Sequence, residues 1–97
     1  MIDHISFAVN NFEESRDFYD QTLSLLGYAR LMNFEDDEHQ VAGYGKNDKT
    51  FLWIGVKKNQ SEQDKHEHVG QAAGFHVGFL APNVESVHQW YAKCLEL

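Results

Sequence analysis

The sequence predicts an α+β domain made of two related modules, each of which begins with a strand followed by a helix. The segment HISFAVNNFEESRDFYDQTL, from His4 to Leu23, returns without a gap as HVGFLAPNVESVHQWYAKCL, from His76 to Leu95. Both copies open on alternating apolar residues and continue with apolar residues at helical spacing. Three more strand-like runs follow the first helix, so the predicted order is β-α-β-β-β, a loop, then β-α.

The first predicted strand covers residues 2–9, where apolar and other residues alternate. Such a period of two is typical of a strand with one buried face. The apolar set is Ile5, Phe7 and Val9. His4 belongs to the opposite set, with Ser6 and Ala8, so we expect its side chain to face away from the core.

A helix is expected directly after this strand. Asn11 and Glu14 have the spacing of a helix N-cap and its partner. Apolar and small residues then recur every three or four positions, at Phe12, Ser15, Tyr19, Leu23 and Leu26. Gly27 stands where a helix end often needs a positive φ.

Three further strands are expected at residues 28–34, 39–45 and 50–57. The first two are joined by the acidic run Glu35 to Glu38, which we expect to be a hydrated turn because adjacent carboxylates repel one another. A short turn at residues 46–48 leads to the third strand. Together with the first strand and helix, these runs complete one βαβββ module.

The second copy is shorter than the first. We expect a strand over residues 75–80 and a helix that carries Val84, Val87, Tyr91, Cys94 and Leu95. The chain therefore reads as one domain, with module one at 1–57, a polar loop at 58–73 and a partial module two at 74–97. The repeat predicts three more strands after Leu97, and one alternative is that these residues are a fragment of a longer product.

The composition narrows the possible partners. The 97 residues carry a net charge of −7 and eight scattered Lys and Arg residues, which argues against a nucleic-acid partner. There is no apolar run long enough for a membrane span and no signal-peptide pattern at the start. The single cysteine, Cys94, fits a reducing environment, so we expect a cytoplasmic protein.

The repeated unit resembles the vicinal oxygen chelate superfamily, which includes glyoxalase I, extradiol dioxygenases and bleomycin resistance proteins. The resemblance rests on DHISFAVNNFEESRDFYDQTLSLLGY and GFHVGFLAPNVESVHQWYAKCL and covers nearly the whole chain. It implies paired βαβββ modules that curl into half-barrels around a ligand or metal cavity. In metal-dependent members, the ligands come from the first and last strands of each module.

The resemblance implies His4 and His76 as ligands of a divalent metal such as Fe, Zn, Ni or Mn. The glutamate of the fourth strand aligns with Trp53, or with Ile54, and neither side chain binds metal. The last ligand would lie beyond Leu97, which would complete a set of two histidines and one carboxylate. His66, Glu67 or a second copy of the chain are alternative donors, although the loop that holds His66, Glu67 and His68 reads first as a solvated polar segment.

Other side chains are candidates for binding a small-molecule ligand. Trp53 would line the cavity and suit a flat molecule, and His39 falls on the same side of its strand as Val41 and Gly43. Tyr28 and Tyr44 are candidates for the mouth of the cavity.

Three functions follow from these observations. The first is a metal-dependent enzyme, of the lactoylglutathione lyase or the extradiol dioxygenase type. The second is a metal-free protein that binds a small molecule, like the bleomycin resistance proteins. The third is a shortened family member without catalysis. In each case the open edges and exposed apolar surface of a partial second module favour a homodimer or larger assembly.

Overall fold

The computed structural model describes residues 1–58 and 76–97 and confirms the predicted α+β class. A complete βαβββ module is followed by a C-terminal helix. The elements are β1 (Ile5–Ala8), α1 (Phe12–Ser24), β2 (Ala29–Glu35), β3 (His39–Lys46), β4 (Lys49–Lys57) and α3 (Val84–Glu96). The predicted strands of module one are therefore present, although β1 is shorter than predicted and begins after His4.

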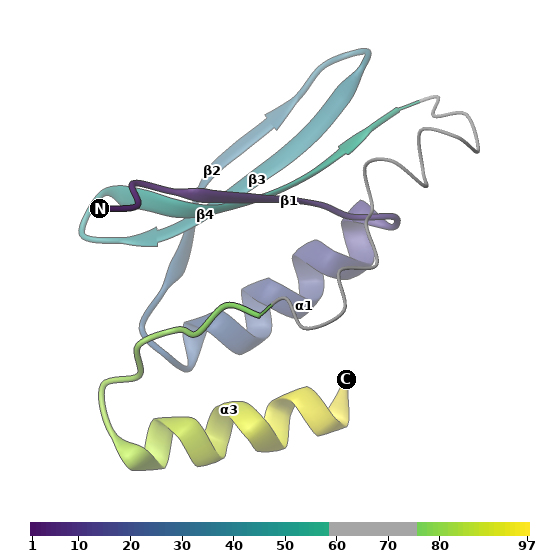
Figure 1. Ribbon diagram of the computed structural model, residues 1–97. Helices are drawn as coiled ribbons and strands as arrows, with labels where there is room; N and C mark the ends of the chain where they lie inside the picture. The colour runs from purple at the N-terminus through teal and green to yellow at the C-terminus, as the bar shows by residue number, and fades with distance from the viewer. Residues whose placement is uncertain (59–75) are drawn as a thin grey trace.

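The four strands form one mixed sheet in the order β1-β4-β3-β2. β2, β3 and β4 are antiparallel neighbours in the sheet, whereas β1 pairs with β4 in parallel, with Ile5 opposite Leu52 and Phe7 opposite Ile54. Figure 1 shows α1 and α3 on the same side of this sheet. The sheet therefore has one face toward the helices, and we call the other its open face.

The two helices begin in the same way, as the repeat predicts. The side-chain oxygen of Asn11 accepts a hydrogen bond from the backbone N–H of Glu14 at 3.1 Å. The side-chain oxygen of Asn83 accepts one from the N–H of Ser86 at 2.8 Å. Each asparagine thus satisfies a backbone donor that has no partner within the helix. After α1, Gly27 has a φ of +89°, as expected of a residue that reverses the chain at a helix end.

The core lies between α1 and the central strands. Phe12, Leu23 and Leu26 are buried against alternate residues of β3 and β4. These alternate residues are Ala42, Tyr44, Leu52 and Ile54. Because side chains alternate across a strand, this packing assigns the residues between them to the open face.

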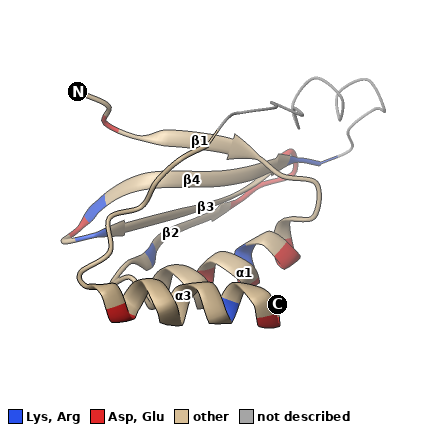
Figure 2. Cartoon of the chain, turned by 60° about the horizontal axis from the view of Figure 1, so that its bottom comes forward, with Lys and Arg blue, Asp and Glu red and all other residues tan. Residues whose placement is uncertain are grey.

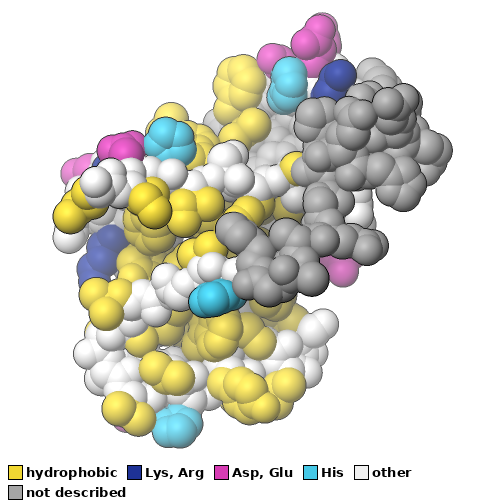
Figure 3. Space-filling model, viewed as in Figure 1, with side chains coloured by type: hydrophobic (Ala, Val, Ile, Leu, Met, Phe, Trp, Pro, Cys, Tyr) yellow, Lys and Arg dark blue, Asp and Glu magenta, His cyan; other side chains and the backbone are white. Residues whose placement is uncertain are grey.

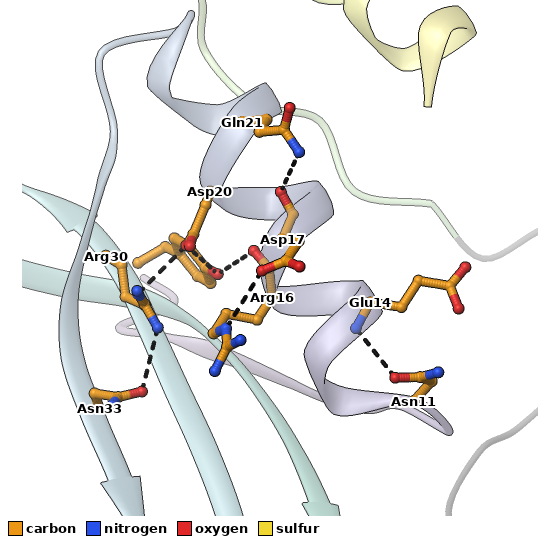
Figure 4. Close-up of polar contacts among 9 residues, drawn as sticks. Asn11, Glu14, Arg16, Asp17, Asp20, Gln21, Arg30 and Asn33 are labelled. Atoms are coloured by element: carbon orange, nitrogen blue, oxygen red, sulfur yellow. Dashed lines mark hydrogen bonds and ion pairs between the residues drawn. The ribbon is translucent and has the colours of Figure 1, made fainter.

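A partly buried polar cluster joins α1 to the sheet (Figure 4). The hydroxyl of Tyr44 lies 2.8 Å from Oδ1 of Asp20 and 3.1 Å from the carbonyl oxygen of Arg16. Nε of Arg30, on β2, is 3.3 Å from the same Asp20 oxygen. Burial, and then the hydrogen bond to Asp20, raise the pKa of Tyr44 above its ordinary value. Tyr44 thus packs against α1, and its expected place at the mouth of a cavity on the open face was wrong.

The predicted strand over residues 75–80 is also wrong for the part that the structure describes. Residues 76–80 belong to none of the described strands. The alternation that suggested a strand is nevertheless present, since Val77 and Phe79 are half-buried while Gly78 and Leu80 are exposed. Phe79 packs against the core below the sheet, and the carbonyl oxygen of Leu80 accepts a hydrogen bond from the hydroxyl of Tyr28 at 2.5 Å. The segment 76–80 therefore partly buries Val77 and Phe79 although none of the described strands pairs with it.

α3 differs from α1 in what its apolar residues contact. α3 packs against α1 through half-buried Trp90, and four apolar side chains lie on its outer surface (Figure 3). These are Val84 (72% exposed), Val87 (48%), Tyr91 (60%) and Leu95 (71%). Tyr91 is therefore an exposed residue of α3. No described helix is long and apolar enough to cross a membrane.

Replacing Tyr44 by phenylalanine tests the partly buried polar cluster. We expect the free energy of unfolding to fall by about 1–2 kcal/mol, because the variant loses a hydroxyl hydrogen-bonded to a carboxylate. Because the folded state raises the pKa of Tyr44, its stabilising proton is fully present below about pH 10 and is lost as the pH rises further. Urea unfolding at pH 7 and above pH 10 measures both effects. Tyr91→Phe is the matched control, and an equal loss in that variant would contradict this role for Tyr44.

Candidate functional site

The open face of the sheet has the features expected of a ligand site. No helix among residues 1–58 and 76–97 covers it, because α1 and α3 both lie on the other side (Figure 1). Its central part is formed by Gly43 of β3 and by Thr50 and Trp53 of β4. The charged residues of the sheet lie mostly at its two ends (Figure 2). The middle of the open face is therefore apolar and uncharged.

Trp53 lies against a glycine on this face. Gly43 is its register partner on β3, and a Cβ atom at Gly43 would be 2.8 Å from Cζ3 of the indole and 2.7 Å from Cγ2 of Thr50. These distances are far shorter than an ordinary carbon contact, so only glycine allows the ring to lie over the strand. The indole is half-buried in this position, which leaves part of its surface available to a ligand.

A cavity of about 260 Å³ lies next to Trp53 on the same sheet. Ser6 and Ala8 of β1, Val41 of β3 and Gly55 of β4 contribute to its lining. Ser6 is the register partner of Trp53, and Gly55 lies two residues further along β4. The indole therefore lies beside the cavity, on the register partner of Ser6 in the cavity lining.

His39 lies at the beginning of β3 and lines this cavity, and its role in binding a ligand stays a prediction. The acidic turn before β3 holds it in place, since Oδ1 of Asp36 accepts the backbone N–H groups of Glu38 at 2.8 Å and of His39 at 2.7 Å. These hydrogen bonds lower the pKa of Asp36. Nδ1 of His39 is 3.7 Å from the same oxygen. The acidic run thus forms an exposed turn that orients the histidine.

The two histidines of the repeat lie in different surroundings. His4 is exposed ahead of β1, with its Nδ1 at 2.9 Å from Oδ2 of Asp3. The other oxygen of Asp3 is 2.6 Å from Nζ of Lys49, and a hydrogen bond to this ammonium is the main reason that the pKa of Asp3 is lowered.

His76 lines a separate cleft of about 370 Å³, together with Phe7, Val9, Tyr19 and Phe79. These four residues pack against the core on the helix side of the sheet, whereas His4 lies outside that cleft.

The described residues do not fit a divalent metal. Within residues 1–58 and 76–97, no three His, Cys, Asp or Glu side chains are grouped so that they could hold an ion. A cation beside His4 would also face the Lys49 ammonium that binds Asp3. Two imidazoles without an anionic third ligand leave a divalent ion poorly coordinated. The alternative donors in the loop, His66, Glu67 and His68, lie outside the described residues, so the metal role of His4 and His76 stays a prediction.

Sequence reasoning missed several features of the site. Tyr28, predicted at the cavity mouth, instead lies on the helix side, where its ring meets Phe79 and its hydroxyl binds Leu80. The contact of Gly43 with Trp53 was not predicted either, because these two residues come together only when β3 and β4 pair. The alternation of Val41, Gly43 and Gly45 along one strand was the available signal.

Gly43→Ala tests the seat of Trp53. The new methyl group would force the indole and Thr50 to move, so we expect a loss of about 1–3 kcal/mol in the free energy of unfolding. Trp53 should also become more hydrated, which would appear as a red shift in its emission. Gly55→Ala on the neighbouring strand is the control, since its Cβ would approach no closer than 3.3 Å to Gln40 and should change both measurements less.

A family comparison agrees with this architecture. Among curated proteins, no sequence matches the chain significantly. The family model described as Glyoxalase/Bleomycin resistance protein/Dioxygenase superfamily matches residues 1–97. The βαβββ module with its mixed four-stranded sheet and the C-terminal helix are consistent with that match. The chain therefore belongs to the glyoxalase, bleomycin resistance protein and dioxygenase superfamily.

Proposed function

We propose that this protein binds a flat aromatic molecule on the open face of its sheet, without a metal ion. The observation that carries the proposal is the half-buried indole of Trp53, seated over Gly43 beside a cavity of about 260 Å³. Small-molecule sites typically combine apolar walls with a few polar groups, and here Ser6, His39 and Lys57 supply the polar groups. The bleomycin resistance proteins that give the superfamily part of its description are one precedent for binding as the function.

Each wall of this site has a distinct role in binding. Trp53 would stack on the plane of the ligand, and Val41 and Ala8 would exclude water from its edge. His39 stands at the end of the cavity, where its imidazole can donate or accept a hydrogen bond. The net charge of −7 favours a cationic ligand over an anionic one during approach.

The metal-dependent enzyme is the second candidate, favoured by the equivalent positions of His4 and His76 in the repeat. The residues that the structure describes do not assemble the required donor set, so we derive no reaction step from it. A binding protein needs no such set, which is why the geometry supports it better.

A titration with 9-aminoacridine, a planar aromatic cation, tests the proposed site. We expect saturable quenching of indole emission and a change in the indole N–H resonance of Trp53 in a ¹⁵N-labelled sample. Trp53→Ala should weaken binding about two- to tenfold, because aromatic stacking contributes that much beyond buried area. A chelator should leave the affinity unchanged.

The controls separate the site from general attraction to an acidic protein. His88→Ala, on exposed α3, should bind as the wild type does. Anthracene-9-carboxylate, a planar anion, should bind less tightly than the cation. Binding that persists in Trp53→Ala, or that disappears with the chelator, would contradict the proposal, and the second result would favour the metal enzyme.

We further propose that α3 pairs with a second copy of the chain. Its outer residues Val84, Tyr91 and Leu95 correspond in the repeat to Phe12, Tyr19 and Leu23, and α1 uses these to pack against the sheet. The same positions on α3 are 60–72% exposed. No charged residue interrupts this stripe, although the chain as a whole is strongly acidic. An exposed apolar stripe of this kind is typical of an interaction surface.

Sedimentation equilibrium at micromolar concentration tests this pairing. The wild type should form dimers or larger species, and Leu95→Glu should shift it toward the monomer, because the new carboxylate would be buried in the contact. Glu85→Gln, on the exposed first turn of the same helix, is the control and should leave association unchanged or slightly stronger. A wild-type protein that is monomeric throughout would exclude the contact.

A further inference from the structure

A further cleft, different from the one that His76 lines, lies on the opposite side of the sheet from the proposed site. It has a volume of about 270 Å³ and lies where the end of α1, the segment 76–83 and α3 meet. Leu26, which follows α1, Phe79 and Ala81 of the segment, and Val87 and Trp90 of α3 contribute to its walls. None of the residues that line it carries a charged side chain. Its surface is therefore suited to a neutral, mostly apolar molecule.

One polar atom in these walls has no hydrogen-bond partner. The indole Nε1 of Trp90 is buried and meets no acceptor among the described residues. A buried donor without an acceptor is unfavourable, and native proteins leave few of them. Trp90 is thus a donor that would gain from an acceptor entering the cleft.

We propose that this cleft binds a compact neutral molecule that has an apolar ring and one hydrogen-bond acceptor, such as an aryl ketone. The ring would lie among Leu26, Phe79 and Val87, and the acceptor oxygen would accept a hydrogen bond from the Nε1–H group of Trp90 after the indole turns toward it. An apolar cavity of about 150 Å³ already holds benzene, so the volume here suits one ring with a short substituent.

This site is independent of the proposed function on the open face. Trp53 lies on the open face and Trp90 lies below the helix side of the sheet, so each of the two tryptophans reports one site. Their indole N–H resonances in a ¹⁵N-labelled sample can be assigned with Trp53→Phe and Trp90→Phe. A failure at one site is therefore distinguishable from a failure at the other.

Acetophenone and α-methylstyrene form a matched pair of probes, because they share a shape and only the first carries an acceptor. We expect acetophenone to shift the Trp90 indole N–H resonance in a saturable manner and to leave that of Trp53 unchanged. It should bind about three- to tenfold more tightly than α-methylstyrene, as expected for one hydrogen bond to a buried donor.

Variants then test the role of the donor. Trp90→Phe keeps an aromatic ring but removes the N–H group, so the two probes should bind it with equal affinity. Trp53→Phe should preserve the difference between the probes. If Trp90→Phe does not fold, the affinities of the two probes for the wild type still test whether a hydrogen-bond acceptor strengthens binding in the cleft. Equal affinities there, or no saturable shift of the Trp90 resonance, would overturn the proposal.

Discussion

The packing of α1 against β3 and β4 determines the rest of the structure. Phe12, Leu23 and Leu26 cover one face of the central strands, and the hydroxyl of Tyr44 joins that face to Asp20 of the helix. Once this face is occupied, the alternation of side chains leaves Gly43 and Trp53 on the other. The position of the candidate site is therefore a consequence of which residues the helix buries.

The two copies of the repeat show how one sequence pattern can acquire two structural settings. Asn11 and Asn83 cap their helices by the same hydrogen bond, since capping depends only on residues within one turn. The apolar stripes that follow differ in burial, because burial depends on whether a sheet lies beside the helix. In the described residues, α1 has such a sheet and α3 has α1 itself as its neighbour. Local structure is thus repeated more faithfully than tertiary contacts.

The same distinction explains which features could be predicted from sequence. The order of elements in module one, the caps and the positive φ of Gly27 follow from patterns a few residues long, and all are present. The alternation of β3 puts His39 on the same strand face as Val41 and Gly43, whereas its role in a ligand site stays a prediction. The contact of Tyr44 with Asp20, and of Gly43 with Trp53, joins separate elements and depends on strand register. The segment 76–80 failed as a strand because a strand also requires a hydrogen-bonded neighbour, which no pattern within the segment reveals.

The parallel pairing of β1 with β4 has a consequence for how the sheet forms. β2, β3 and β4 follow one another through short turns, so they can assemble from contacts that are near in sequence. β1 must wait for Ile5 to meet Leu52, after α1 and two other strands have been made. Closing so long a loop carries a larger entropy loss, and non-local contacts of this kind slow folding. Ser6 and Ala8 belong to this strand, so we expect the lining of the open face to be complete only once β1 has paired with β4, and to be lost when that edge of the sheet opens.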